Sequence, residues 1–159
     1  MGKEAELIGM LRDNGMTIAC AESLTGGLVS GTLVSVPGAS YAFMEGFVTY
    51  DIGAKHRTLG ISKDILDKEG AISPVTAREM AIGAAKKAGT DMALATTGNA
   101  GPDPSEGKPV GLVYTTVYIK GNVQVYEHML KGTRPEIREQ TVNAVIEEAW
   151  HLLSEQTER

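Results

Sequence analysis

Hydrophobic residues recur at helical spacing in four stretches of the chain, and each stretch has its own start or stop signal. In the first stretch, Leu7, Ile8 and Leu11 share one helix face, and Asn14-Gly15 then supplies a stop. The third stretch begins with an N-cap serine followed by a first-turn proline, Ser73-Pro74. The fourth begins with a capping box from Thr133 to Glu136. The predicted helices run from Ala5 to Asn14-Gly15, from Thr25 to Val36-Pro37, from Ser73-Pro74 to Ala88, and from Thr133-Arg134-Pro135-Glu136 through Leu153.

Between the helices, short apolar or alternating runs predict five strands. They cover Thr17–Ala21, Phe43–Tyr50, Met92–Thr97, Val110–Ile119 and Val123–Leu130. The last two flank a glycine-containing turn and therefore predict an antiparallel hairpin. Because helices and strands alternate early and the hairpin comes late, we expect a three-layer α/β/α fold with a mixed, centrally parallel sheet. We expect one domain over residues 1–159.

Composition narrows the functional classes. The chain has 159 residues and a net charge of −5, which leaves no basic face for nucleic acid. It has neither a secretory signal pattern nor a run long enough to span a bilayer, so we expect a cytoplasmic protein without membrane contact. Cys20 is the only cysteine, and no His-x-x-x-His or Cys-x-x-Cys pair occurs. We therefore expect no disulfide and no metal site, and because nucleotide-cofactor glycine motifs are also absent, no cofactor.

Two glycine-containing loops follow predicted strands, at the sheet edge where α/β proteins bind ligands. Their backbone N–H groups suit an anion or a developing oxyanion. The alternative is that these glycines only shape turns. The candidate ligand-binding residues are Thr25, Gly26 and Gly27 in the first loop and Gly98, Asn99 and Gly101 in the second.

Ser23 is the hydroxyl best placed at a strand end to act as a nucleophile. Its candidate base is Lys55, because a lysine that is desolvated in a pocket can lose its proton near neutral pH. Tyr50 precedes it and has a phenol that could relay a proton. The alternative for Lys55 is an ordinary solvated charge. We expect surface or packing roles for the three histidines, His56, His128 and His151.

Arg134 and Arg138 are four residues apart at the start of the last predicted helix and therefore share a face. Positive side chains at a helix N-terminus oppose the helix dipole, which a bound phosphate would explain. Salt bridges with Glu136 or Glu139 are the alternative.

A series of separated motifs now points to one family. The motifs are Ala21-Glu22-Ser23-Leu24-Thr25-Gly26-Gly27, Val36-Pro37-Gly38-Ala39-Ser40, Phe47-Val48-Thr49-Tyr50 with Ala54-Lys55, Gly70-Ala71-Ile72-Ser73, and Thr97-Gly98-Asn99-Ala100-Gly101-Pro102 followed by Lys108-Pro109-Val110-Gly111. With them the chain resembles the C-terminal domain of the competence/damage-inducible protein CinA, which also exists as stand-alone nicotinamide mononucleotide deamidases. The resemblance covers nearly the whole chain.

The resemblance implies a metal-free amidohydrolase that converts nicotinamide mononucleotide and water to nicotinate mononucleotide and ammonia. Ser23 falls on the family's nucleophile, Lys55 on its base, and Tyr50 on a tyrosine beside the base. We expect backbone N–H groups from Thr25 to Gly27 to hold the oxyanion. The loop from Gly98 to Gly101, together with Arg134, is expected to hold the ribose phosphate.

Some positions depart from the family pattern. Leu24 stands where cysteine is usual, and Asp51-Ile52-Gly53 stands where Ser-Asn-Glu is usual. These departures motivate an alternative hypothesis, a catalytically inactive module of the same fold that binds a nucleotide or phosphate ligand. A third reading is a homo-oligomer subunit, with Tyr41, Phe43 and Met44 as apolar interface residues.

Overall fold

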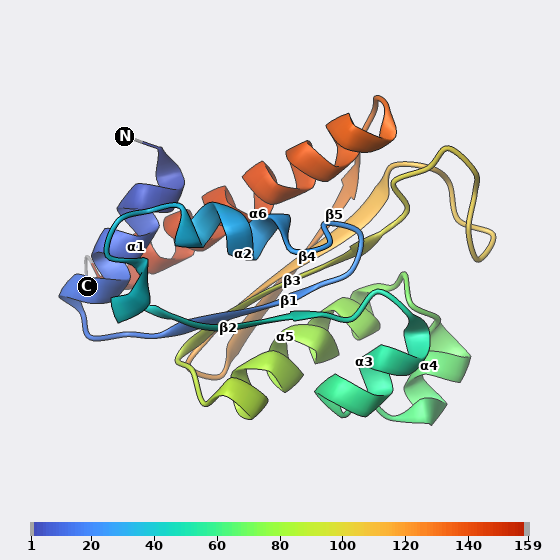
Figure 1. Cartoon of the computed structure of the whole chain (residues 1–159). Coiled ribbons are helices and arrows are strands. Elements are labelled where there is room, and N and C mark those ends of the chain that lie inside the picture. The colour runs from blue at the N-terminus through green and yellow to red at the C-terminus, as the bar shows by residue number, and fades with distance from the viewer. Residues whose placement is uncertain (1, 158–159) are drawn as a thin grey trace.

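The computed structural model describes residues 2–157 (Figure 1). In chain order the elements are α1 (Lys3–Asp13), β1 (Ile18–Glu22), α2 (Leu28–Val34), the short 3-10 helix η1 (Ala39–Tyr41), β2 (Phe43–Val48), α3 (Ile52–Leu59), α4 (Lys63–Glu69), α5 (Pro74–Ala88), β3 (Met92–Gly98), β4 (Leu112–Ile119), β5 (Asn122–Met129) and α6 (Arg134–Thr157).

The five strands form one mixed sheet in the order β2-β1-β3-β4-β5. Strand β1 runs parallel to both β2 and β3, whereas β3 with β4 and β4 with β5 are antiparallel. The predicted sheet, parallel in its first half and closed by an antiparallel hairpin, is therefore confirmed. The carboxyl ends of β1 and β3 lie side by side, since Glu22 pairs with Thr96.

Helices cover both faces of the sheet, which confirms the three-layer architecture (Figure 1). Alternation along the strands separates the two faces. Larger strand residues such as Ile18 and Leu94 pack against α1, α2 and α6, and small ones such as Ala93 and Ala95 pack against α5. The small residues allow α5 to lie close to the sheet, with α3 and α4 beside it (Figure 1).

Both predicted helix caps are present. The Ser73 hydroxyl accepts a hydrogen bond from Thr76 N (3.0 Å) at the start of α5. At the start of α6, Glu136 accepts from Thr133 N (2.9 Å) and the Thr133 hydroxyl accepts from Glu136 N (3.4 Å), as in a capping box. Hydrogen bonding of the Glu136 carboxyl to the Thr133 backbone N–H, and then to the Thr133 side chain, lowers the pKa of this carboxyl.

Several strand and helix boundaries differ from the prediction. Strand β2 ends at Val48 because the chain turns toward α3, and β4 begins at Leu112 because Gly111 has a φ of 93°. Helices α3 and α4 have no predicted counterpart, since they are short segments of eight and seven residues. No helix among residues 2–157 has both the length and the hydropathy needed to cross a membrane.

Gly98 shows why the second loop needs glycine where it leaves β3. A Cβ built there would lie 2.7 Å from both Leu112 O and Val113 Cα, so the strands could not keep their spacing. We predict that Gly98→Ala lowers the free energy of unfolding by about 3 kcal/mol, measured by urea denaturation.

Gly9→Ala is the matched control. Gly9 lies in α1 with nothing within 4 Å of the added Cβ, so the substitution should raise stability by up to about 1 kcal/mol. Equal effects of the two substitutions would contradict the close-packing argument.

Candidate active site

A cavity of about 320 Å³ lies beyond the carboxyl ends of β1 and β3. It is therefore at the sheet edge where the sequence predicted ligand binding. The lining comes from five separate parts of the chain: Ser23 and Leu24, Tyr50, Ala71 and Ile72, Thr97–Glu106 without Pro104, and Arg134.

Ser23 and Lys55 meet beside this cavity. The turn after β1 carries Ser23 and helix α3 carries Lys55, and their Oγ and Nζ atoms are 3.0 Å apart. Lys55 Nζ also donates to the backbone carbonyls of Thr49 (2.6 Å) and Tyr50 (3.3 Å). The two carbonyls take two amine hydrogens, so the remaining position on the nitrogen faces the Ser23 hydroxyl.

The Lys55 side chain is fully buried, which is unusual for lysine. Burial lowers the pKa of Lys55 to about 8, although the charges of Asp51 and Glu106 oppose this shift. A measurable fraction of the amine is therefore neutral near neutral pH and can accept a proton. The solvated-charge alternative for Lys55 does not hold.

Tyr50 contributes its backbone to the Ser23–Lys55 pair. Its carbonyl oxygen lies 3.3 Å from Lys55 Nζ and 3.5 Å from Ser23 Oγ. Its phenol is exposed and accepts a hydrogen bond from Arg134 Nη2 (3.2 Å) at the rim of the cavity. The hydrogen bonds of residues 2–157 do not join this phenol to Ser23 or Lys55, and the predicted proton relay stays a prediction.

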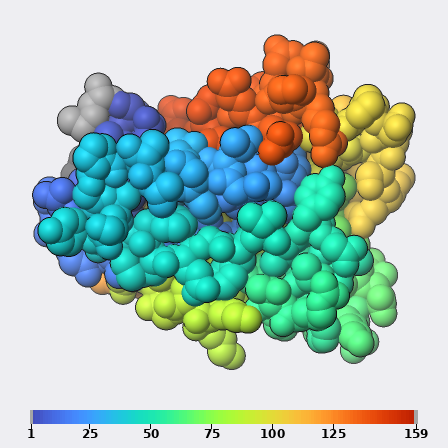
Figure 2. Space-filling view, viewed as in Figure 1, coloured from blue at the N-terminus to red at the C-terminus, as the bar shows by residue number. Residues whose placement is uncertain are grey.

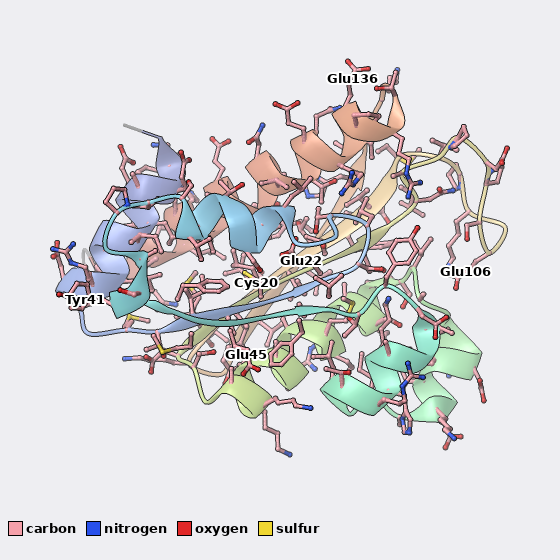
Figure 3. All side chains as sticks on the ribbon, viewed as in Figure 1. Cys20, Glu22, Tyr41, Glu45, Glu106 and Glu136 are labelled. Carbon is pink, nitrogen blue, oxygen red and sulfur yellow. The ribbon has the colours of Figure 1, made fainter. Side chains whose placement is uncertain are left out.

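Glu22, the last residue of β1, organises the turn that presents Ser23. Its carboxylate is completely buried and is visible at the centre of Figure 3. One oxygen accepts from the Thr25 hydroxyl (2.6 Å), Gly27 N (3.2 Å) and Val29 N (2.8 Å). The other accepts from Ser30 N (2.9 Å) and the Ser30 hydroxyl (2.7 Å). A carboxylate from the preceding strand thus caps α2, whose own N-cap residue has no side chain to do so.

This network changes the predicted role of the first loop. The Thr25 side chain is buried against Glu22 and Thr96, and the N–H groups of Gly26 and Gly27 bond to Ser23 O and to Glu22. Gly26 and Gly27 have φ values of 57° and 105°, so glycine serves the shape of the turn. Both glycine N–H groups therefore have acceptors within the turn, which leaves the predicted ligand contacts of this loop to its other N–H groups.

Two other N–H groups beside Ser23 have no acceptor among residues 2–157. They belong to Leu24 and Thr25. The carbonyls of both residues are held by Arg138, whose Nε donates to Leu24 O (2.8 Å) and whose Nη2 donates to Thr25 O (3.2 Å). Because N–H and C=O point in opposite directions across a trans peptide, Arg138 directs the Thr25 N–H away from itself.

Arg134 and Arg138 therefore have different surroundings. Arg134 lines the cavity and donates from Nη1 to Gly101 O (2.6 Å). Arg138 is engaged by the Ser23 turn and does not line the cavity. Neither arginine forms a salt bridge with Glu136 or Glu139 in the described part of the chain, so that alternative is wrong.

The second loop supplies most of the residues that line the cavity. The Asn99 side chain donates to Asp103 O (3.1 Å) and Lys108 O (3.3 Å) and accepts from Gly101 N (2.9 Å). Asn99 therefore shapes the loop, which leaves its amide little capacity for a ligand. Gly98 is required by packing against β4, and Gly101 offers its carbonyl to Arg134.

Glu106 lines the cavity although the sequence did not single it out, and Lys108, which the sequence named only within a motif, lies beside it. Glu106 accepts from Ala71 N (2.8 Å) and Ile72 N (2.9 Å), and the Lys108 amine donates to Ile72 O. Together they fasten the segment before α5 to the second loop and so form one wall of the cavity. These contacts join residues more than 30 positions apart, for which no local sequence pattern exists.

Of the positions that depart from the family pattern, Leu24 lines the cavity, whereas Asp51, Ile52 and Gly53 do not. Asp51 caps α3 through Gly53 N (2.9 Å), and Ile52 and Gly53 line a separate hollow over α3 and α4. The Leu24 side chain is buried in a small cluster with Ile137 and Val113. The Ser23–Lys55 contact is thus present together with these residues.

No group of three His, Cys, Asp or Glu side chains converges within residues 2–157 in a way that could hold a metal ion. Cys20 is buried behind the site, and desolvation and the nearby Glu22 raise the pKa of its thiol well above the usual value. The thiol is therefore unreactive.

The chain matches the family model "CinA C-terminal domain" over residues 2–153. It belongs to the CinA C-terminal domain family. A competence-damage inducible protein of Clostridium kluyveri is 49% identical over 146 residues, which are 90% of this chain and 36% of that protein. A CinA-like protein of Kosmotoga olearia is 48% identical over 136 residues, which are 85% of this chain and 33% of that protein. The chain thus spans about a third of the length of these CinA relatives.

Solved structures of CinA proteins have the same fold. A CinA superfamily protein from Klebsiella pneumoniae superposes with a TM-score of 0.93 at 26% identity, covering 96% of both chains. The competence/damage inducible protein CihA from Agrobacterium tumefaciens superposes with a TM-score of 0.87 at 37% identity, covering 97% of both chains. Family membership is consistent with an enzyme of the amidohydrolase type, and these names state no substrate.

The hydrogen bonds of Glu22 predict that replacing one of its carboxylate oxygens by an amide NH₂ group has a large effect on stability. In Glu22→Gln, an amide NH₂ would replace one carboxylate oxygen and face either Ser30 N or the N–H groups of Gly27 and Val29. We expect the free energy of unfolding to fall by about 3 kcal/mol, measured by urea denaturation. Glu45→Gln, at an exposed position of β2, is the control and should change it by less than about 0.5 kcal/mol. Equal effects at both sites would contradict the assigned role of Glu22.

Proposed function

We propose that this chain is an amidohydrolase that deamidates nicotinamide mononucleotide, with Ser23 as nucleophile and Lys55 as base. The observation that carries the proposal is the 3.0 Å contact between Ser23 Oγ and the buried Lys55 amine. A serine needs a base to become a nucleophile, and a desolvated amine with a pKa of about 8 meets that need.

In the first half of the reaction, the neutral amine of Lys55 takes the Ser23 hydroxyl proton while Oγ attacks the carboxamide carbon. The carbonyl π electrons move to the oxygen, and the N–H groups of Leu24 and Thr25 stabilise the resulting oxyanion. This assignment replaces the Gly26 and Gly27 N–H groups expected from the sequence. When the C–N bond breaks, the Lys55 ammonium gives its proton to the departing nitrogen, which leaves as ammonia.

In the second half, water repeats the sequence on the acyl-enzyme. Lys55 takes a proton from the attacking water, the second oxyanion occupies the same donors, and the ester bond to Ser23 breaks. Lys55 then returns the proton to Ser23 Oγ, which restores the starting state. The sum is one amide and one water converted to one carboxylic acid and one ammonia.

The cavity suits a small nucleotide in size and charge. Its volume of about 320 Å³ is within the usual range for small-molecule sites. Asp103 and Glu106 make part of the lining acidic, so a phosphate fits best at Arg134. Two N–H donors of Arg134 are used by Gly101 O and the Tyr50 hydroxyl, which leaves three of its five for a phosphate.

The alternative function is a nucleotide- or phosphate-binding module without turnover, suggested by Leu24, Ile52 and Gly53. Two observations favour catalysis over this alternative. Ile52 and Gly53 do not line the cavity, and a simple binding site has no need of a buried amine against a serine hydroxyl. The binding module without turnover is therefore kept only as one possible outcome of the ammonia-release assay described next.

The test is ammonia release from nicotinamide mononucleotide by the wild type and by Ser23→Ala. We expect release by the wild type and a loss of at least about 10³-fold in the variant, because the nucleophile is gone. Ser40→Ala, at an exposed serine of η1, is the control and should keep full activity. Binding without release by the wild type would favour the module, and an active Ser23→Ala would refute the nucleophile.

Lys55 predicts the pH dependence of the reaction. Only the neutral amine can accept the Ser23 proton, so kcat/KM should rise about tenfold per pH unit below 8 and level off above it. Lys55→Arg, which keeps a permanent charge, should be inactive over this range. The measurement is a pH profile of initial rates, and an acid limb with a midpoint near pH 6 would contradict Lys55 as the base.

A further inference from the structure

The cavity of the candidate active site carries acidic side chains for which the proposed reaction has no use. Among the described residues that line it, Asp103 and Glu106 are acidic and Arg134 is basic. Both acids come from the loop after β3, and Figure 2 shows this loop, coloured yellow, on the outside of the molecule next to the start of α6 in orange. Arg134 is assigned to the phosphate, which leaves the two negative charges of the loop to be explained.

The Glu106 carboxylate is a fixed charge at this wall of the cavity (Figure 3). Its two oxygens accept from Ala71 N (2.8 Å) and Ile72 N (2.9 Å), so each oxygen is held by a backbone donor. The backbone of Glu106 has a φ of 54°, in the left-handed region that residues with a Cβ rarely adopt. Backbone of this kind persists where the surrounding structure holds it, and it is concentrated at functional sites. The position of the Glu106 charge is therefore built into the loop.

The charge of Glu106 also reaches the reacting pair. Burial lowers the pKa of Lys55, and the charges of Asp51 and Glu106 raise it again in part. Since the Lys55 amine lies 3.0 Å from Ser23 Oγ, a ligand that binds at Ser23 is within the field of the Glu106 carboxylate.

Asp103 supplies a second carboxylate, which is free. The residue is exposed and lines the cavity, and its side chain forms no ion pair within residues 2–157. Its backbone is nevertheless held, because Asn99 Nδ2 donates to Asp103 O (3.1 Å). A carboxylate at a fixed backbone position, without a charged partner in the chain, is available to a positive group of a ligand.

We propose that Asp103, supported by the charge of Glu106, selects ligands that carry a positive charge on the ring beside the amide. This inference rests on the proposed function, in which the amide reaches Ser23 and the phosphate reaches Arg134. The ring of nicotinamide mononucleotide is a pyridinium cation, because its nitrogen is bonded to the ribose. A cavity with two carboxylates and one guanidinium is complementary to a ligand with a ring cation and a phosphate. The reduced nucleotide has nearly the same shape but a neutral dihydropyridine ring, so the carboxylates do not attract its ring.

Isothermal titration calorimetry with these two nucleotides tests the inference. The Ser23→Ala chain is used, because it lacks the proposed nucleophile and leaves the ligand intact. Both ligands carry the same amide and phosphate, so the ratio of their affinities isolates the ring charge. We expect the oxidised nucleotide to bind at least about tenfold more tightly than the reduced one. Higher ionic strength should reduce this preference, because exposed charges are screened by salt.

Adding Asp103→Asn to the Ser23→Ala chain should reduce the preference about threefold to fivefold, the effect of losing one exposed charge pair. The reduced nucleotide should bind as before. A merely structural role of Asp103 would weaken both ligands alike and leave the ratio unchanged. Because Asp103 is exposed, the variant should keep the circular dichroism spectrum of its parent.

Asp13→Asn in the same Ser23→Ala chain is the matched control. It makes the same change in net charge at an exposed residue that ends α1 and does not line the cavity, so the preference should not change. Equal affinities for the two nucleotides, or binding of neither, would overturn the proposal. A preference that Asp103→Asn leaves intact, or that Asp13→Asn reduces equally, would overturn it as well.

The result can be told apart from that of the ammonia-release assay. Selective binding of the oxidised nucleotide, with no ammonia release by the wild type, would leave the charge selection standing and remove the deamidase. Ammonia release by the wild type, with equal affinities for the two nucleotides, would remove the charge selection and leave the deamidase standing.

Discussion

The arrangement of the site depends on one buried carboxylate. Glu22 ends the central strand β1 and at the same time caps α2, so strand, turn and helix are joined by a single side chain. Arg138 holds the outer side of the same turn through Leu24 O and Thr25 O. The turn is thus fixed from two sides, and Ser23 faces Lys55.

Burial gives Lys55 its chemical character, and the backbone gives it its position. The carbonyls of Thr49 and Tyr50 come from the segment where β2 ends and α3 has not yet begun. Because β2 ends at Val48, the carbonyls of Thr49 and Tyr50 can turn toward Lys55 Nζ. In a strand that continued through Tyr50, these carbonyls would adopt the geometry of a sheet. Desolvation then lowers the pKa of the amine that they hold.

Local patterns in the sequence were sufficient to predict the mixed sheet and both helix caps. They were also sufficient to select Ser23 and Lys55 as candidate site residues. The contact between these two residues is now observed, while their catalytic roles stay predictions. What the sequence could not provide were contacts between distant segments, such as Arg138 with the Ser23 turn and Glu106 with Ala71. For the same reason Asn99 was expected to bind a ligand, although its side chain is used by its own loop.

The separation between the Ser23–Lys55 pair and the second loop has an evolutionary consequence. The pair is held by β1, α3 and backbone carbonyls, whereas most of the cavity wall comes from the loop after β3 and from Arg134. Substitutions in that loop at positions other than Glu106 can therefore change the shape of the cavity while the contact between Ser23 and Lys55 stays in place. A scaffold of this kind can diverge in the ligand that it accepts while it keeps the same pair of side chains.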